Sequence, residues 1–165
     1  MACAGSMRAA TAGSVDERAP VARRHEALER AADAMVSRPK TLGPDTSVAA
    51  LHRFFADEHV HMALIVDAAG RLLTTIERGD LPSNTSVQPV AIAELGRLRD
   101  RTVAPTTPLV DVTVRLQEQG RRRLAVVDDA DVLLGLLCLK RDGTGYCSDL
   151  GILARSASRL LRAAK

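Results

Sequence analysis

The chain has 165 residues, enough for one filled α/β module of two repeats with a short extension at each end. Hydrophobic residues make up 46% of the sequence but aromatic residues only 2%, so the core must be aliphatic, and the rings that stack on single-stranded nucleic acid are scarce. The net charge of +3 does not by itself indicate a nucleic-acid partner, and no apolar stretch reaches the roughly 20 residues that span a bilayer.

The N-terminal segment divides into two parts. Residues 1–14 are rich in Ala, Gly and Ser, and we expect them to be disordered. They lack a basic stretch followed by an apolar one, so they do not resemble a signal peptide. The segment 15–35 is predicted to form an N-terminal helix, with its clearest apolar periodicity from Pro20 to Met35.

The next helix is predicted from apolar residues at helical spacing. Val48, Leu51 and Phe55 recur at intervals of three and four residues, which places them on one helical face. Thr46 is the candidate N-cap of this helix, because a threonine hydroxyl can accept a hydrogen bond from a free backbone N–H.

Two apolar runs follow that helix. One extends from Met62 to Val66 and ends at Asp67, and the second opens at Leu72. Both carry apolar residues at odd and even positions, which indicates strands covered on both faces. Such strands favour a parallel or mixed sheet with helices packed on it.

A proline-containing linker then leads to a second set of similar elements. Residues 82–89 contain two prolines and small polar residues, which cannot extend a helix. A short helix is predicted from Ala91 to Leu98. The next helix carries Leu109, Val112 and Leu116 on one face, with Thr107 as candidate N-cap and Pro108 at the first helical position.

The C-terminal part is predicted to contain a loop and a last helix. Gly143-Thr144-Gly145 forms the loop, and Ser148 caps a helix that runs to about Ala164. This helix is expected to bury Leu150 and Leu153.

The two sets of elements are copies of one unit. Starting at Thr41 and at Thr102, the two stretches match without a gap at an offset of 61 residues. Each unit has the order strand, helix, strand, strand. A repeat of this length that occurs twice is a tandem domain rather than a solenoid.

The second copy resembles the cystathionine β-synthase (CBS) domain family. The resemblance lies in Thr-Val-Ala-Pro-Thr-Thr-Pro-Leu from Thr102, in Gly120-Arg-Arg-Arg-Leu-Ala-Val-Val-Asp and in Leu133-Leu-Gly-Leu-Leu, and it extends from about Met35 to Leu153. It implies a tandem CBS pair, with two β-α-β-β repeats related by pseudo-twofold symmetry. The expected division is 36–90 for repeat 1 with the linker and 91–165 for repeat 2 with the C-terminal helix.

The family also implies a site at the end of the third strand of each unit. In members that bind nucleotides, a Ser or Thr there contacts phosphate, and an Asp three residues later holds the ribose hydroxyls. The corresponding residues are Glu77 and Asp80 in the first copy, called here the first junction, and Cys138 and Arg141 in the second copy, called the second junction. Only Asp80 retains the family pattern, and Glu77 would repel phosphate. The alternative is that Asp80 caps a turn before Pro82 and that Glu77 and Arg141 are solvated.

Cations of the second copy are the other candidate ligands. Lys140 and Arg141 precede the loop that contains Thr144, whose backbone N–H groups could form a nest for an anion; a simple hairpin loop is the alternative. Strand alternation points Arg122 away from its two arginine neighbours, so it could line a cleft or simply open a basic strand. We expect a nucleotide to place its ribose on Asp80 and its phosphates on Arg141 and Lys140.

The sequence supports a metal site, a reactive thiol or a catalytic site less strongly than a nucleotide site. His59 and His61 share one face of an extended segment, but His59 aligns with Gly120 beyond a helix end, which favours helix termination over a metal site. Cys138 reads as a small core residue and Cys147 as a loop thiol; with Cys3 they form no CxxC motif. No catalytic motif is present, so we do not expect an enzyme.

Two functions follow as hypotheses. The first is a cytoplasmic, non-catalytic regulatory module that needs no cofactor, senses AMP, ADP, ATP or another adenosyl ligand, and modulates an unknown partner protein. The second is a structural or interaction module with degenerate clefts. In either case we expect a homodimer, because closed twofold symmetry is the commonest form of oligomer.

Overall fold

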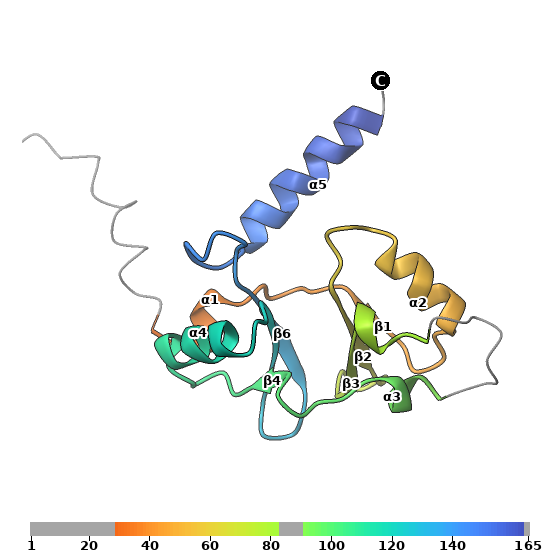
Figure 1. Ribbon diagram of the computed structural model, residues 1–165, viewed down its shortest axis with the longest axis horizontal. Helices are drawn as coiled ribbons and strands as arrows, with labels where there is room; N and C mark the ends of the chain where they lie inside the picture. Colours follow the sequence, from red (N-terminus) through yellow and green to blue (C-terminus); the bar gives the residue numbers. More distant parts are fainter. Residues whose placement is uncertain (1–28, 83–90, 164–165) are drawn as a thin grey trace, which may run out of the picture.

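The computed structural model describes residues 29–82 and 91–163, which form two small three-stranded sheets with helices around them (Figure 1). The predicted mixed α/β fold class is confirmed. The segment 1–14, most of the predicted N-terminal helix and most of the linker lie outside the described residues.

The first repeat contains four elements in the predicted order. They are β1 (Thr41–Leu42), α2 (Val48–Phe55), β2 (Met62–Val66) and β3 (Leu72–Glu77). In this sheet β2 lies in the middle, parallel to β1 and antiparallel to β3. The first four residues of β2 are buried, so the prediction of a strand covered on both faces is confirmed.

The second repeat has the same topology. It consists of β4 (Thr102–Val103), α4 (Leu109–Glu118), β5 (Arg123–Val127) and β6 (Leu133–Cys138). Here β5 is the middle strand, parallel to β4 and antiparallel to β6. Every strand of this repeat begins and ends 61 residues after its counterpart. Even the break in strand register at Ile65/Val66 recurs at Val126/Val127.

Backbone contacts between the repeats reveal the pseudo-twofold axis. Arg71 forms an isolated antiparallel bridge with Val132, the residue 61 positions later, so each repeat meets its own equivalent there. Two hydrogen bonds flank the bridge and are exchanged by equivalent residues: Leu72 N–H donates to Asp131 O (2.8 Å) and Leu133 N–H donates to Gly70 O (3.0 Å). The two sheets are therefore joined where their β-hairpins turn.

Each repeat is preceded by a short helix and the stretch of chain that follows it, here called its leading segment, and each leading segment packs on the other repeat. The short helix α1 (Ala31–Ala34) precedes repeat 1 but packs on α4 and β6 of repeat 2, whereas α3 (Ile92–Leu95) precedes repeat 2 and packs on β3 of repeat 1. The chain after each helix then bridges the same sheet, Val36 to Leu136 and Arg97 to Thr75. Each sheet is thus covered by a segment that comes from outside its own strand-helix-strand-strand unit.

Where each leading segment passes over the sheet of the other repeat, a glycine packs against a larger residue. A Cβ on Gly135 would lie 2.6 Å from Met35 Sδ, and a Cβ on Gly96 would lie 2.5 Å from Thr74 Oγ1. Gly96 is equivalent to Met35, and Thr74 is equivalent to Gly135. At each crossing, a residue without a side chain faces a larger one, but the glycine is on the sheet in repeat 2 and on the leading segment in repeat 1.

The core is aliphatic, as the composition predicted. One buried cluster belongs to each repeat, and a third contains Met62, Leu64 and Leu72 of repeat 1 together with Ala125 of repeat 2. On the two middle strands, Ile65 and Val126 have no exposed surface, whereas Val66 and Val127 at the strand ends are only partly buried.

The helix starts differ from the predictions by one residue. Ser47, not Thr46, caps α2, because its hydroxyl accepts the Ala50 N–H at 3.1 Å while the Thr46 hydroxyl donates to the Gly43 carbonyl. Pro108 occupies the N-cap of α4 instead of the first helical position. The described part of the N-terminal helix is only α1, because Arg30 is extended and bridges Pro108.

The last helix, α5 (Asp149–Ala163), extends away from the rest of the molecule (Figure 1). Ser148 accepts the Gly151 N–H at 3.2 Å, as a cap would. The prediction that this helix buries Leu150 and Leu153 is wrong: they are 75% and 65% exposed, because nothing in the described chain packs on that side of the projecting helix. No helix in the described segments is both long and apolar enough to cross a membrane.

The exchanged side-chain sizes give a prediction about packing. Gly135→Thr should lower the free energy of unfolding by about 1 to 3 kcal/mol, because the new side chain meets Met35 and the Val36 carbonyl. Adding Met35→Gly should recover part of this loss by reproducing the arrangement of repeat 1. Urea denaturation measures both effects. Gly43→Ala is the control, since no atom lies within 4 Å of its Cβ position; an equal loss in the control would contradict this explanation.

Candidate functional site

The first junction is an acidic turn at the end of β3. A single turn of 3-10 helix, Arg78–Asp80, follows Glu77 and returns Asp80 toward the strand. The Asp80 carboxylate accepts the Glu77 backbone N–H at 2.7 Å. Two carboxylates therefore stand side by side at the end of the strand.

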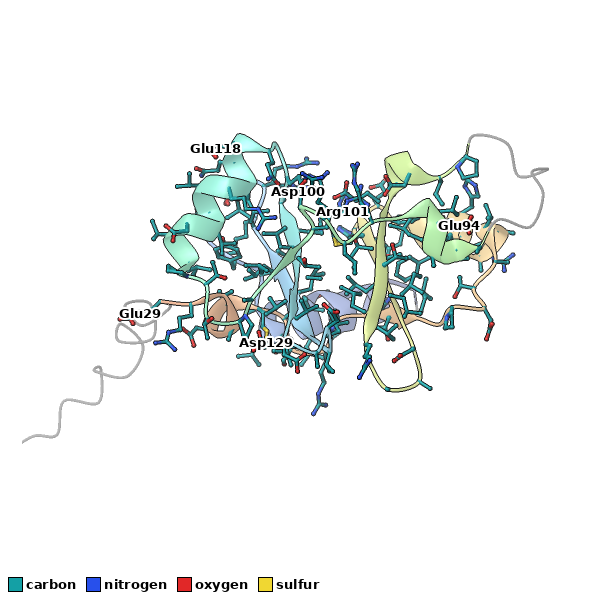
Figure 2. The ribbon with its side chains drawn as sticks, turned by 90° about the horizontal axis from the view of Figure 1, so that it is seen from below. Glu29, Glu94, Asp100, Arg101, Glu118 and Asp129 are labelled. Carbon is teal, nitrogen blue, oxygen red and sulfur yellow. The ribbon has the colours of Figure 1, made fainter. Side chains whose placement is uncertain are left out.

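A buried arginine from the second repeat contacts both carboxylates. Arg101 is 1% exposed, and its guanidinium makes two hydrogen bonds to Asp80, one of them 3.0 Å long. It also lies 3.1 Å from Glu77 Oε2 and donates to the Thr75 carbonyl at 2.9 Å. Figure 2 shows Arg101 between the two repeats, near the centre of the molecule. We call Glu77, Asp80 and Arg101 the ion cluster.

The backbone fixes Arg101 in this place from both sides. Its N–H donates to the Leu98 carbonyl at 3.0 Å, and its carbonyl accepts the Ala125 N–H at 2.9 Å. The preceding residue, Asp100, has a φ of 62° in the left-handed region, which turns the chain just before β4. The segment that crosses onto repeat 1 at Arg97 thus delivers Arg101 to the first junction.

The ion cluster keeps Asp80 ionised. Burial alone would raise the pKa of Asp80, but hydrogen bonds from the Arg101 side chain and the Glu77 backbone, with the charges of Arg101 and Arg97, outweigh it and lower the pKa below its ordinary 3.8. Asp80 therefore carries a full negative charge at neutral pH, and Arg101 already balances it.

Further cations surround the cluster where β5 begins. Arg121 lies 3.3 Å from Glu77 Oε1. Burial and the charges of Arg123, Arg122 and Arg78 lower the pKa of His61, so this imidazole is neutral at pH 7. A group of like charges at His61 is unfavourable for a metal cation.

The remaining predicted ligand residues lie at the second junction. Lys140, Arg141 and Thr144 are exposed on the loop that follows β6, where both the Thr144 N–H and its hydroxyl donate to Asp142. Arg122 is half-buried, and its carbonyl accepts the Leu139 N–H at 2.8 Å, so it lies beside the base of this loop. Asp80, by contrast, is held at the first junction by Arg101 and Glu77, and the structure shows no bond from it to the loop.

Arg101 was not predicted as a site residue from the sequence. Its counterpart in repeat 1 is Lys40, which is exposed and forms no ion pair within the described segments. The available signal was a cation at equivalent positions before both first strands, 61 residues apart. What it could not show is that the segment after α3 crosses to the other repeat and so approaches Glu77.

Comparisons with known proteins agree with this architecture. A family model described as "CBS domain" matches residues 31–81 and 92–141. The comparison with curated protein sequences found no match. Among solved structures, the chain is similar to the CBS domain pair of protein MJ0100 in complex with 5′-methylthioadenosine and S-adenosyl-L-methionine, with 19% identity and a TM-score of 0.55 over 84% of this chain and 99% of that one.

Two other solved structures have the same fold. The cytosolic domain of the Mg²⁺ channel MgtE in complex with ATP is 22% identical, with a TM-score of 0.55 over 71% of this chain and 50% of that chain. The CBS domain protein TA0289 from Thermoplasma acidophilum is 23% identical, with a TM-score of 0.54 over 76% and 74% of the two chains. Likeness at this level of identity establishes the fold and leaves the ligand of this chain open.

The ion cluster should be a large contributor to stability. Arg101→Met should lower the free energy of unfolding by about 3 to 5 kcal/mol, because it leaves two carboxylates without their buried partner. Arg99→Met, a substitution at the neighbouring and 92% exposed arginine side chain, should change it by less than about 0.5 kcal/mol. Chemical denaturation distinguishes them, and similar values for the two variants would contradict a buried cluster.

Acid titration tests the charge of Asp80. Its pKa in the folded state is lowered, so its contribution to stability is complete above about pH 5 and is lost as the pH falls through the folded-state pKa. The difference in unfolding free energy between the wild type and Asp80→Asn should therefore shrink from pH 5 to pH 3. In the Arg101→Met background the pH dependence should be weaker, since the guanidinium that lowers the pKa is gone. A difference that stays constant down to pH 3 would argue against the ion cluster.

Proposed function

The chain belongs to the CBS domain family, and from that premise we propose that it is a non-catalytic regulatory module of the cytoplasm that binds an adenine nucleotide or a related adenosyl ligand and changes its contacts with a partner protein. Two structures of the same fold support the ligand class, because one carries 5′-methylthioadenosine and S-adenosyl-L-methionine and the other carries ATP.

The unequal charge of the two junctions carries the proposal. At the first junction, Arg101 and Arg121 already balance the carboxylates of Glu77 and Asp80. At the second junction, the equivalent positions hold Cys138 and Arg141, and no ion pair to Lys140 or Arg141 is found among the described residues. The second junction therefore offers a net positive charge to an anionic ligand, since Asp142 offsets only one of its two cations.

The phosphates of the nucleotide would lie against the second junction. Lys140 and Arg141 supply the charge, the exposed loop supplies Thr144, and Arg122 lies at its base. Asp80 remains the acid for the ribose. Because Arg101 now occupies that carboxylate, the ribose hydroxyls would have to displace part of the ion cluster, and ligand binding would then loosen the contact between the repeats.

Ligand-induced stabilisation tests the proposal. A ligand present at 100 times its dissociation constant adds about 2.7 kcal/mol of stability, which for a chain of this size raises the melting temperature by about 5 to 10 °C. AMP, ADP, ATP, NADH and S-adenosylmethionine form the panel, at concentrations up to the millimolar range. At least one of them should produce such a shift; no shift with any of them would support the interaction module described below.

Calorimetry with variants locates the site. Arg141→Ala should weaken ATP binding by about 10-fold or more while affecting adenosine little, because only ATP presents phosphate charge to the guanidinium. Asp80→Asn should weaken both ligands. Arg99→Ala is the matched control, because Arg99 is an exposed arginine whose ion-pair partner is Asp100. Tight ATP binding that is unchanged in both site variants would place the pocket elsewhere.

A second function is an interaction module without a nucleotide. The observation that favours it is the apolar exposure of α4, where Val110 and Val114 are 67% and 47% exposed although they belong to a helix that packs on the sheet. Exposed aliphatic residues at i and i+4 form a stripe suited to a second copy of the chain.

Association through α4 is directly measurable. The wild type should sediment at twice the 17.6 kDa chain mass at micromolar concentration, and the double variant Val110→Asp/Val114→Asp should sediment as a single chain. Glu118→Lys, at an exposed polar position of the same helix, should leave the dimer intact. A wild type that sediments as a monomer would exclude this dimer.

A further inference from the structure

Two cysteines face each other across a short hairpin at the second junction. Cys138 is the last residue of β6, and the chain returns beside it after the loop 140–145. The bridge between Leu139 and Tyr146 sets the register, which places Cys147 directly opposite Cys138. The Cys147 N–H donates to the Cys138 carbonyl at 2.8 Å, so the two residues face each other at a hydrogen-bonding position of this antiparallel pairing.

The geometry of this pair suits a covalent bond between the side chains. The two sulfur atoms are 3.2 Å apart, which is close contact for thiols. Directly opposite residues of such a pair have Cα atoms about 5.5 Å apart, within the range of about 4.4 to 6.8 Å seen in disulfides. The sulfur atoms need to approach by about 1 Å to reach bonding distance. Gly143 and Gly145, both with positive φ, lie in the turn of the hairpin, and the wide conformational range of glycine allows the backbone there to absorb this movement.

The surroundings assign different roles to the two thiols. Burial raises the pKa of Cys138 to about 11, although the charge of Arg123 opposes this, so Cys138 is a neutral thiol at pH 7. Cys147 lines a surface cavity of about 370 Å³ between α1 and the start of α5, together with Met35, Tyr146 and Asp149. A small disulfide reagent can therefore reach Cys147 from the cavity. Cys138 is placed to react with the mixed disulfide that would form on Cys147.

We propose that Cys138 and Cys147 form a reversible intramolecular disulfide, a modification site that accepts oxidising equivalents from a small-molecule disulfide such as glutathione disulfide. The thiolate of Cys147 attacks one sulfur of the reagent, which releases one glutathione thiolate and leaves a mixed disulfide. Cys138 then loses its proton and attacks the Cys147 sulfur, which releases the second glutathione. The two protein thiols are oxidised, and one glutathione disulfide is reduced to two glutathiones.

The disulfide would act on two elements that flank it. It closes the loop that carries Lys140, Arg141 and Thr144, so these three side chains would be presented from a covalently closed hairpin. It also holds the chain just before Asp149, whose carboxylate accepts hydrogen bonds from Ser37 at the base of α5. This inference needs no nucleotide, so it stands or falls independently of the proposed ligand.

Thiol counting in glutathione buffers tests the proposal. The full chain with Cys3→Ser retains only the two cysteines of the pair. It is equilibrated over a series of ratios of reduced to oxidised glutathione, quenched with acid, denatured, alkylated and weighed by mass spectrometry. We expect both alkylation sites to disappear together, with a mass two hydrogens lower, and dithiothreitol to restore them. The equilibrium constant for disulfide formation should be at least about 10-fold larger in the native protein than in urea, because the fold holds the sulfur atoms together.

Single-cysteine variants separate the roles of the two sulfurs. In the Cys3→Ser background, Cys138→Ser should acquire one glutathione at Cys147. Cys147→Ser should acquire it at Cys138 at least about 10-fold more slowly, since that thiol is protonated. Retention of both alkylation sites at every glutathione ratio, or a native equilibrium constant no larger than that in urea, would overturn the proposal. Stable glutathione adducts on both cysteines in place of the disulfide would overturn it as well.

Discussion

The exchange of leading segments across the pseudo-twofold axis is the constraint on which the rest of this structure depends. Neither sheet is covered by its own repeat alone, because α1 lies on repeat 2 and α3 lies on repeat 1. The chain after each helix continues along the foreign sheet and then enters its own first strand. The residue just before that strand is therefore delivered to the junction of the opposite repeat, which is how Arg101 reaches Glu77 and Asp80.

The same geometry applied to the other half explains why the junctions have diverged. The position equivalent to Arg101 is Lys40, and the positions equivalent to Glu77 and Asp80 are Cys138 and Arg141. The second junction has no acid at these two positions that could pair with Lys40, and Lys40 is exposed. An ion cluster of opposite charges can be buried because its members compensate one another, whereas like charges at the second junction remain at the surface. The two repeats therefore share one backbone. The side chains at three equivalent positions determine that the first junction is filled by the ion cluster, whereas the second junction is exposed to solvent.

Much of the fold could be predicted from the sequence because it depends on local patterns. The offset of 61 residues, the two apolar strands that end each unit and the helix before them follow from periodicity, and the structure has the same offset at every strand. The errors occurred where a local pattern had two solutions or where a distant contact decides. Ser47 and Thr46 can both cap a helix, and only the backbone turn at Gly43 selects between them. Leu150 and Leu153 form an apolar face on α5, but periodicity does not say whether anything covers it.

Distant contacts, which local sequence patterns do not predict, determine the chemistry of the site even more than they determine the fold. The position of Asp80 just after β3 could be predicted because the family pattern is local. That its charge is already balanced depends on a contact across 21 residues and between two repeats, which no short motif encodes. Cys138 was read as a core residue for the same reason, because its partner Cys147 becomes its neighbour only when the hairpin after β6 closes. In both cases the residue that changes the chemistry of the junction comes from a segment that crosses back to it: Arg101 from the exchanged segment and Cys147 from the hairpin return. The chemistry of a CBS junction in this chain is therefore set less by its two family positions than by the strand or segment that lies against them.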